Sequence, residues 1–307
     1  MTAFLLLLAT FQSGSDTHVL LVTGVGGEPR FSAAFERQGA DLLQALTGQY
    51  GVPRSRVMWL AESQPEGRSL ISGRSTSEAV RSALTQLATT VGPDDQVLIV
   101  YIGHGSDATE PKLNLPGPDL TALELRALLS GFTSQRVAVV FASSASGGMI
   151  DVLAGPGRLI MTATKTGLER NETVFATAFV AGMSGAAADT DKDRRLSLAE
   201  AFNYAVAEVA RVYSSDNRLQ TEHARLSDST LASRFVLATV SVAAAQATDS
   251  VSLALLVQKA GLERQIDALR ARRGEMPAAD YESAFEVLVL DLARINQQLR
   301  VRAGRSP

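Results

Sequence analysis

Short apolar runs of strand length alternate along the chain with longer stretches that repeat apolar residues at helical spacing. This alternation is typical of βαβ units built around a mainly parallel sheet. The pattern therefore predicts an α/β domain over residues 17–245. Strands are predicted within His18–Val25, Arg56–Ala61, Val97–Asp107, Val137–Ile150 and Arg158–Thr164. Helices are predicted over Phe31–Tyr50, Ser77–Val91, Leu120–Leu129, Thr173–Met183 and Leu198–Tyr213.

The end of the chain follows a different pattern. Phe235–Val242 is either a last strand or a connection, and from about residue 250 Ala, Leu, Arg, Glu and Gln dominate. Two heptad seams separated by Arg273–Pro277 predict an antiparallel helical hairpin over residues 250–303. We expect this hairpin to be a packing appendage or a self-association element. The seams consist of Leu255, Leu262, Ile266 and Leu269, and of Phe285, Leu288, Leu292, Ile295 and Leu299.

Composition excludes several classes of protein. The 307 residues are 46% hydrophobic and 20% charged, as in a globular protein with a sizeable core. A formal charge of −3 argues against a nucleic-acid binder, which should carry a concentrated basic face. Because the chain has no cysteine, disulfides, thiolate metal sites and thiol catalysis are all excluded.

The first 16 residues form an apolar leader and a polar linker, with the apolar run extending from about Ala3 to Phe11. This run resembles the core of a signal peptide, although no basic residue precedes Arg30 and no Ala-x-Ala-like cleavage site is clear. We expect a protein exported to the periplasm or the extracellular space, or a cytoplasmic one if the leader is not a signal. Elsewhere no stretch reaches the ~18 uninterrupted apolar residues of a membrane helix.

Small polar residues follow two of the predicted buried strands. The first strand breaks at His104, which lies between two glycines, and the second breaks at Ser143, Ser144 and Ser146. In open α/β sheets, ligands bind at the carboxyl ends of the strands, where such side chains and free backbone N–H groups are presented. The pattern therefore predicts a nucleophile–base site at this edge of the sheet.

The segments Val97–Asp107 (VLIVYIGHGSD) and Val137–Ile150 (VAVVFASSASGGMI) resemble the legumain family and its caspase-like relatives. The resemblance implies a caspase-like three-layer sandwich and a peptidase that acts on peptide or protein substrates. It places His104 at the catalytic base and Ser144 at the nucleophile. The N–H of Gly105 would form the oxyanion hole together with that of Ser144.

Two departures from the family pattern bear on activity. Ser144 replaces the family's nucleophilic cysteine, and Gly26 stands where the family has an asparagine that orients the histidine. A serine hydroxyl needs a base that is itself held by a third group, since it is not ionised as a thiol can be. Spacing does not choose among the candidate acids for that role, which are Asp107, Glu110 and Asp151.

The sequence also allows two alternative interpretations of these serine and histidine residues. An α/β-hydrolase would need Gly-x-Ser-x-Gly and a histidine after the serine; the motif is absent here, although His223 does lie downstream. In the other alternative, the serine and glycine cluster is only a strand-to-helix turn that uses these residues for geometry and capping. The function expected is thus a peptidase homologue that hydrolyses or only binds peptides, or a non-catalytic scaffold that uses the sandwich and the hairpin.

An acidic segment between the last two predicted helices has the spacing of an EF-hand calcium loop. Arg194 occupies the sixth position, where glycine normally makes the turn, and basic neighbours offset the acidic charge. The alternative is a solvated acidic turn at the start of a helix. The spacing predicts one structural calcium ion, with ligands from Asp189, Asp191, Asp193, the Arg195 carbonyl, Ser197 and Glu200.

Overall fold

The computed structural model describes residues 16–64, 70–133, 136–238 and 278–303, with scattered positions from 255 to 277. The chain divides into two compact units. One comprises residues 17–240, and the other comprises residues 1–16 with residues 241–307. The predicted leader and most of the first half of the predicted hairpin lie outside the described residues.

A seven-stranded sheet forms the centre of the larger unit, with strand order β11-β9-β8-β4-β1-β2-β3. Every neighbouring pair is parallel except β11 and β9, which are antiparallel. The prediction of a mainly parallel sheet is confirmed. The strands are β1 (Thr17–Thr23), β2 (Val57–Ala61), β3 (Gly73–Arg74), β4 (Gln96–Gly103), β8 (Arg136–Ser143), β9 (Arg158–Thr162) and β11 (Arg225–Leu226).

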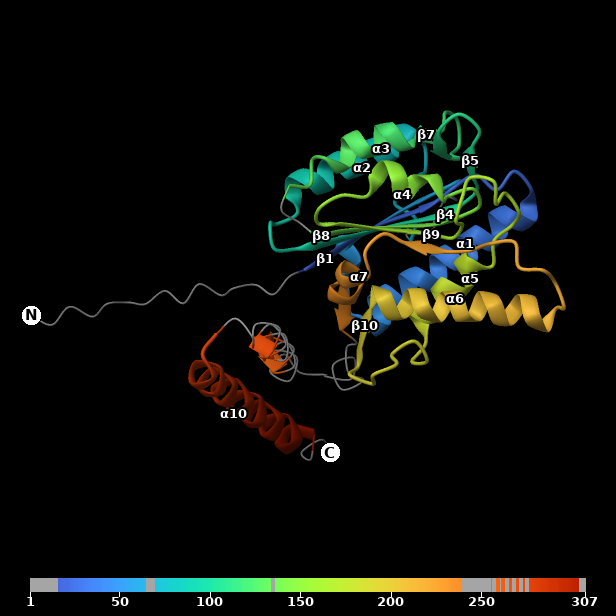
Figure 1. Cartoon of the computed structure of the whole chain (residues 1–307). Coiled ribbons are helices and arrows are strands. Elements are labelled where there is room, and N and C mark those ends of the chain that lie inside the picture. Colours follow the sequence, from blue (N-terminus) through green and yellow to red (C-terminus); the bar gives the residue numbers. More distant parts are fainter. Residues whose placement is uncertain are drawn as a thin grey trace, which may run out of the picture. The chain divides into compact units, whose positions relative to one another are not determined.

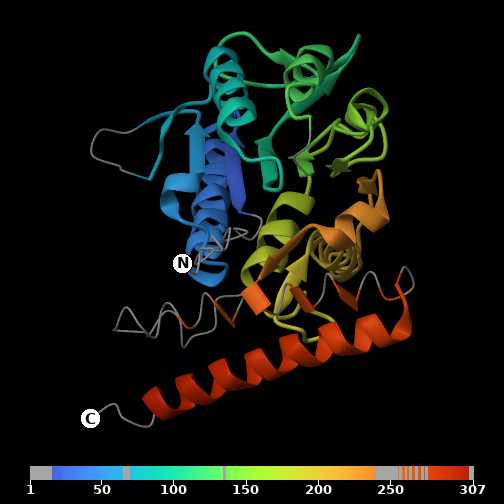
Figure 2. The ribbon, with the colours of Figure 1, turned by 90° about the vertical axis from the view of Figure 1, so that its left-hand side faces the viewer.

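Helices cover both faces of this sheet and complete a three-layer α/β sandwich (Figure 1). The quarter-turn in Figure 2 shows the sheet between the two helical layers. One layer contains α1 (Pro29–Gln44), α5 (Phe175–Ser184), α6 (Leu198–Ser215) and α7 (Ser229–Arg234), with the single π-helical turn Ala45–Gln49 after α1. The other contains α2 (Ser77–Thr90), α3 (Ala122–Leu129) and α4 (Gly148–Leu153).

Burial of both faces explains why the central strands are continuous apolar runs rather than alternating ones. All eight residues of β4 are buried. Ile102 packs into the core on the α1 side of the sheet, and Tyr101 packs on the α2 side. Successive side chains of a strand alternate between faces, so this parity directs position 104 to the α1 side.

Two small sheets lie outside the main one. β5 (Gly105–Asp107), β6 (Pro111–Leu113) and β7 (Leu120–Thr121) form an antiparallel sheet directly after His104. The connection between β4 and α3 is therefore partly a small sheet and not simply a loop. The predicted strand or connection near residue 235 contains β12 (Val236–Ala238), which pairs antiparallel with β10 (Arg195–Ser197).

The smaller unit contains the long helix α10 (Ala278–Ala303), which is the second helix of the predicted hairpin. The guanidinium of Arg273 lies 5.4 Å from the ring centre of Tyr281, and that of Arg270 lies 5.6 Å from Phe285. These cation–π contacts connect the segment before the turn to α10, as an antiparallel arrangement requires. Its role in self-association stays a prediction.

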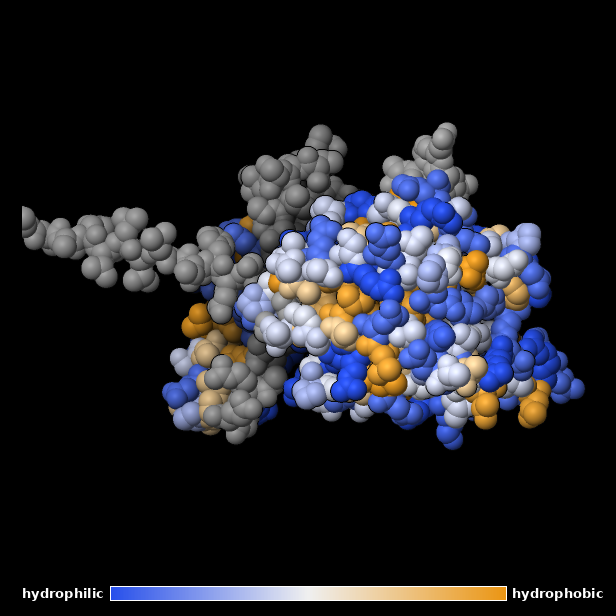
Figure 3. Space-filling view, turned by 90° about the horizontal axis from the view of Figure 1, so that it is seen from above, coloured by the Kyte–Doolittle hydropathy of each residue, from blue (hydrophilic) through white to orange (hydrophobic). Residues whose placement is uncertain are grey.

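No helix in the described ranges is long and apolar enough to cross a membrane. Figure 3 shows one face of the molecule, where small apolar areas lie among hydrophilic side chains. Scattered apolar residues of this kind are usual on protein surfaces.

Candidate functional site

The two strands that carry the predicted site residues are neighbours in the sheet. β4 and β8 are parallel, and Gly103 is the register partner of Ser143. His104 and Ser144 directly follow these two positions, so the neighbouring strands deliver both to the same carboxyl edge of the sheet. The structure brings together the two residues that the sequence predicts as base and nucleophile.

His104 is held on an apolar wall formed by α1. Its ring lies edge-on to Phe31, at 4.7 Å between ring centres, and to Phe35, at 5.1 Å. Its backbone carbonyl accepts hydrogen bonds from the Tyr101 hydroxyl at 2.6 Å and from the Asn114 N–H at 3.1 Å. These contacts fix both the backbone and the ring of His104 at the end of β4.

None of the described carboxylates forms a hydrogen bond or ion pair with the His104 ring. Among the candidate orienting acids, Asp151 instead lies 3.9 Å from the guanidinium of Arg225. Asp107 packs against Gly167, where an added Cβ would lie 2.1 Å from its Oδ2. Glu110 lies in the turn between β5 and β6. The arrangement over the described chain is therefore a serine–histidine pair without a bonded acid.

Position 26, where the family pattern has an orienting asparagine, has no room for a side chain. A Cβ on Gly26 would lie 2.3 Å from the backbone nitrogen of Ser32 at the start of α1. The Gly26 N–H lies 3.3 Å from the Glu62 carboxylate, its acceptor. Close packing of the end of β1 on α1 thus replaces a polar side chain that could have oriented His104.

The three serines of the turn after β8 have different surroundings. Ser146 exchanges hydrogen bonds with Thr164, whose hydroxyl also accepts the Gly147 N–H at 3.0 Å. Ser143 is 1% exposed, and its Oγ has no hydrogen-bond partner in the described part of the structure. Ser144 is 5% exposed and makes no side-chain hydrogen bond to another described residue. Ser146 therefore holds the turn, while Ser144 is not bound to a structural partner.

The residue after Ser144 is in an unusual backbone conformation. Ala145 has a φ of 50°, in the left-handed region, which costs a residue with a Cβ about 1–2 kcal/mol. Its N–H donates to the backbone carbonyl of Glu169 at 2.8 Å. Strained residues of this kind persist where surrounding contacts enforce them, and they cluster at functional sites.

Gly105 lets β5 pass directly over the serine turn. A Cβ at this position would lie 2.5 Å from the backbone oxygen of Ser144 and 3.3 Å from Oγ of Ser143. A contact of 2.5 Å is too short for any side chain, so this approach requires glycine. Three predicted site residues, His104, Gly105 and Ser144, therefore meet at one place.

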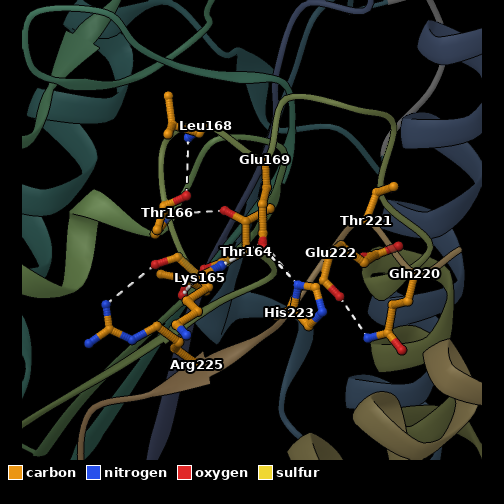
Figure 4. Close-up of polar contacts among 12 residues, drawn as sticks. Thr164, Lys165, Thr166, Leu168, Glu169, Gln220, Thr221, Glu222, His223 and Arg225 are labelled. Carbon is orange, nitrogen blue, oxygen red and sulfur yellow. Dashed lines mark hydrogen bonds and ion pairs between the residues drawn. The ribbon is translucent and has the colours of Figure 1, made fainter.

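A second polar group near this edge was not predicted from the sequence (Figure 4). It joins Glu169, in the loop between β9 and α5 (residues 163–174, the β9–α5 loop), to His223, just before β11. Oε1 of Glu169 lies 2.7 Å from Nδ1 of His223, and Oε2 accepts the His223 N–H at 3.0 Å. The partners are separated by 54 residues in sequence. No local pattern could have revealed the pair.

The acidic loop before α6 brings its first three carboxylates together. Asp189, Asp191 and Asp193 each offer an oxygen within 4.8 Å of the others. Arg194 has a φ of 65°, so it adopts the left-handed turn that glycine usually makes at this position, and its N–H donates to Oδ2 of Asp189 at 3.0 Å. Oδ1 of Asp189 is buried and has no hydrogen-bond partner among the described residues.

The charges of this loop act on neighbouring groups. Burial of the Asp193 carboxyl group raises its pKa, and repulsion by Asp191 and Asp189 adds to this effect. The hydrogen bond from the Arg195 N–H acts in the opposite direction but does not cancel it. Glu200 accepts hydrogen bonds from the backbone and hydroxyl groups of Ser197 and Thr190. Burial opposes ionisation of Glu200, but these hydrogen bonds together lower its pKa. The loop thus gathers four carboxyl groups before and within the first turn of α6.

Three solved structures are among those similar to parts of this chain. A crystal structure of drICE is 12% identical with a TM-score of 0.42, and the match covers 65% of this chain and 84% of that one. Protein GSU0716 from Geobacter sulfurreducens is 14% identical with a TM-score of 0.44, covering 69% and 92%. A secreted C11 cysteine protease from Bacteroides thetaiotaomicron, in complex with an irreversible peptide inhibitor, is 12% identical with a TM-score of 0.38, covering 64% and 59%.

No curated protein matches the chain. The family model described as Peptidase C13 matches residues 71–256, which is more than half of the 307 residues. The matched segment includes both strand ends of the site. The resemblance to the legumain family that the sequence predicts is confirmed. The chain therefore belongs to the Peptidase C13 family.

Proposed function

We propose that this protein receives extended peptides at the edge formed by His104 and Ser144, and that it hydrolyses them slowly. The proposal is supported by the register of β4 and β8, in which Gly103 pairs with Ser143, the residues just before His104 and Ser144, in a Peptidase C13 chain. The packing of Gly105 on the Ser144 carbonyl supports the same placement.

The reaction would be an acyl transfer. The Ser144 oxygen bonds to the peptide carbonyl carbon while His104 takes the hydroxyl proton. The N–H groups of Gly105 and Ser144 stabilise the oxyanion. The C–N bond then breaks as His104 returns the proton to the leaving amine, and water hydrolyses the ester. Without a bonded acid on His104, we expect a rate far below that of a full triad, since losing that acid costs about 10⁴.

A fluorophosphonate probe tests this assignment, because it labels an activated serine covalently without requiring the natural substrate. We expect slow labelling of the wild type, and loss of labelling in Ser144→Ala and in His104→Ala. Ser143→Ala is the matched control, since Ser143 is buried and outside the proposed chemistry, and it should label as the wild type does. Labelling that survives in Ser144→Ala would refute the assignment.

The alternative is a non-catalytic peptide-binding or scaffold protein. The absence of a described acid on the His104 ring favours it. In that case no probe labels the wild type at any pH, while wild type and Ser144→Ala bind the same peptides with equal affinity. Fluorescence anisotropy with a labelled peptide library measures this binding directly.

We also propose that the acidic loop binds one calcium ion. The ligands would be Asp189, Asp191, Asp193, the Arg195 carbonyl, Ser197 and Glu200. The proposal is supported by the three convergent carboxylates and by the unpartnered, buried Oδ1 of Asp189. A bound ion would join this loop to the first turn of α6.

Calorimetric titration and thermal unfolding in calcium and in chelator test the site. At a calcium concentration 100 times Kd, the ion should stabilise the fold by about 2.7 kcal/mol. Asp191→Asn should reduce the affinity and the gain in Tm. Asp216→Asn, an exposed acid at the end of α6, should change neither. No binding heat and an unchanged Tm would contradict the proposal.

A further inference from the structure

The β9–α5 loop lies directly on the serine turn. A Cβ on Gly147 would lie 2.3 Å from the backbone carbon of Lys165 and 2.3 Å from the nitrogen of Thr166. The Ala145 N–H donates to the carbonyl of Glu169 at 2.8 Å. The residue in the left-handed conformation is therefore held by one specific carbonyl of this loop.

The side chain of Glu169 fixes the position of this carbonyl. Oε2 of Glu169 accepts the Lys165 N–H at 2.7 Å, which closes the loop on itself. Both oxygens then bind His223, one through the backbone N–H and the other through Nδ1 (Figure 4). The Glu169 side chain is 18% exposed, whereas that of His223 is 53% exposed.

The segment that carries His223 is itself anchored. The neighbouring residue Glu222 is 2% exposed, and its carboxylate accepts the N–H groups of Val174 and Phe175, at 2.7 and 3.1 Å. The carbonyl of Glu222 accepts the amide of Gln220 at 2.7 Å. Glu222 thus secures the far end of the β9–α5 loop, while His223 secures its middle.

We propose that His223 is a positioning residue for the candidate nucleophile. It holds Glu169 through two hydrogen bonds, and Glu169 holds the Ala145 amide and therefore the backbone turn that presents Ser144. This inference rests on the proposed function of Ser144, but the holding of the turn is a separate physical claim.

The sheet order argues against direct proton transfer by His223. His104 follows β4, which is the neighbour of β8, whereas His223 precedes β11, and β9 lies between β11 and β8. β11 therefore lies two strand spacings, or about 10 Å, from β8, the strand that precedes Ser144. In addition, the Nδ1 side of the His223 ring is already bound to Glu169. His104 is therefore the base in the proposed reaction, and His223 acts through the loop.

Three variants of the full chain test the proposal. His223→Ala removes the side-chain donor. His223→Asn keeps a nitrogen donor near the place of Nδ1 but removes Nε2 and the imidazole. His18→Ala is the matched control, because His18 pairs with Asp95 at the opposite end of the sheet. Circular dichroism and Tm establish that each variant is folded.

Hydrogen exchange provides the first readout. In His223→Ala we expect exchange at the Ala145 amide and in the β9–α5 loop to accelerate about tenfold, as loss of a hydrogen bond to a charged group allows. Protection should be retained in His223→Asn and in His18→Ala. Unchanged exchange in His223→Ala would overturn the proposal, whatever the activity of Ser144.

The rate of fluorophosphonate labelling provides the second. It should fall about tenfold in His223→Ala, in proportion to the lost protection, and recover in His223→Asn. If His223→Asn keeps the protection but labels as slowly as His223→Ala, then His223 transfers protons and is not a positioning residue. If the wild type is never labelled, the proposed hydrolysis fails, while the exchange data still decide whether His223 holds the turn.

Discussion

Gly105 is the residue whose replacement tests the geometry of the site most directly. Gly105→Ala would place a methyl group 2.5 Å from the Ser144 carbonyl, so either β5 or the serine turn must move. We expect the free energy of unfolding to fall by about 1–3 kcal/mol, as for overpacking in a core, and labelling of Ser144 to be lost.

Gly155 offers a matched control for that substitution. A Cβ there would meet no atom within 4 Å, and its φ is not in the left-handed region. Gly155→Ala should therefore leave both stability and labelling close to the wild-type values. Denaturant unfolding measured in parallel on the two variants checks the prediction, which fails if Gly105→Ala is as stable as Gly155→Ala.

At this scale the sequence predicted which residues would meet but not how they would be supported. The two strands end in small polar residues, and parallel strands end at one edge. The resemblance to the legumain family then singles out His104 and Ser144 among them. The role of Ser146 as a partner of Thr164 and the pairing of Glu169 with His223 depend on contacts across 18 and 54 positions. Such contacts leave no periodic signal in the sequence.

Among the elements, the connection between α5 and the segment before β11 depends on one buried acid. Burial raises the pKa of Glu222 above the ordinary value of 4.5, against the hydrogen bonds from Val174, Phe175 and Tyr213. The folded protein therefore binds this proton more tightly than the unfolded chain does. The corresponding stability is complete below pH 4.5 and is lost as pH rises through the raised pKa.

Glu222→Gln should remove this pH dependence. The free energy of unfolding of the wild type, relative to the variant, should decrease between acid and neutral pH, because only the wild type must carry a buried charge. Glu172→Gln, at an exposed position in the β9–α5 loop that Glu222 anchors, is the control. Urea unfolding over this pH range checks the expectation, and parallel curves for wild type and Glu222→Gln would contradict it.

Most elements agree with their predictions to within a few residues, because their apolar periodicity is strong. Thr76 caps the start of α2, where its side chain accepts the Ala79 N–H. The sequence pattern did not predict some strands, such as β3, β10 and β11, which are two or three residues long. Pairing with distant segments, and not local pattern, makes them strands.

For the molecule as a whole, the candidate site extends beyond the segment that matches the family. The match begins at residue 71, yet the apolar wall behind His104 is formed by Phe31 and Phe35 in α1. Gly26, which excludes an orienting side chain, also precedes the match. The departures that set this chain apart therefore lie partly in its first strand and helix.

The two outermost strands of the main sheet, β3 and β11, are only two residues long. Within the described residues, neither border of the sheet offers another polypeptide more than a short row of unpaired amides and carbonyls. Long open borders are templates for aggregation and for sheet-to-sheet joining between copies. Border strands as short as these should disfavour both at the edges of the sheet.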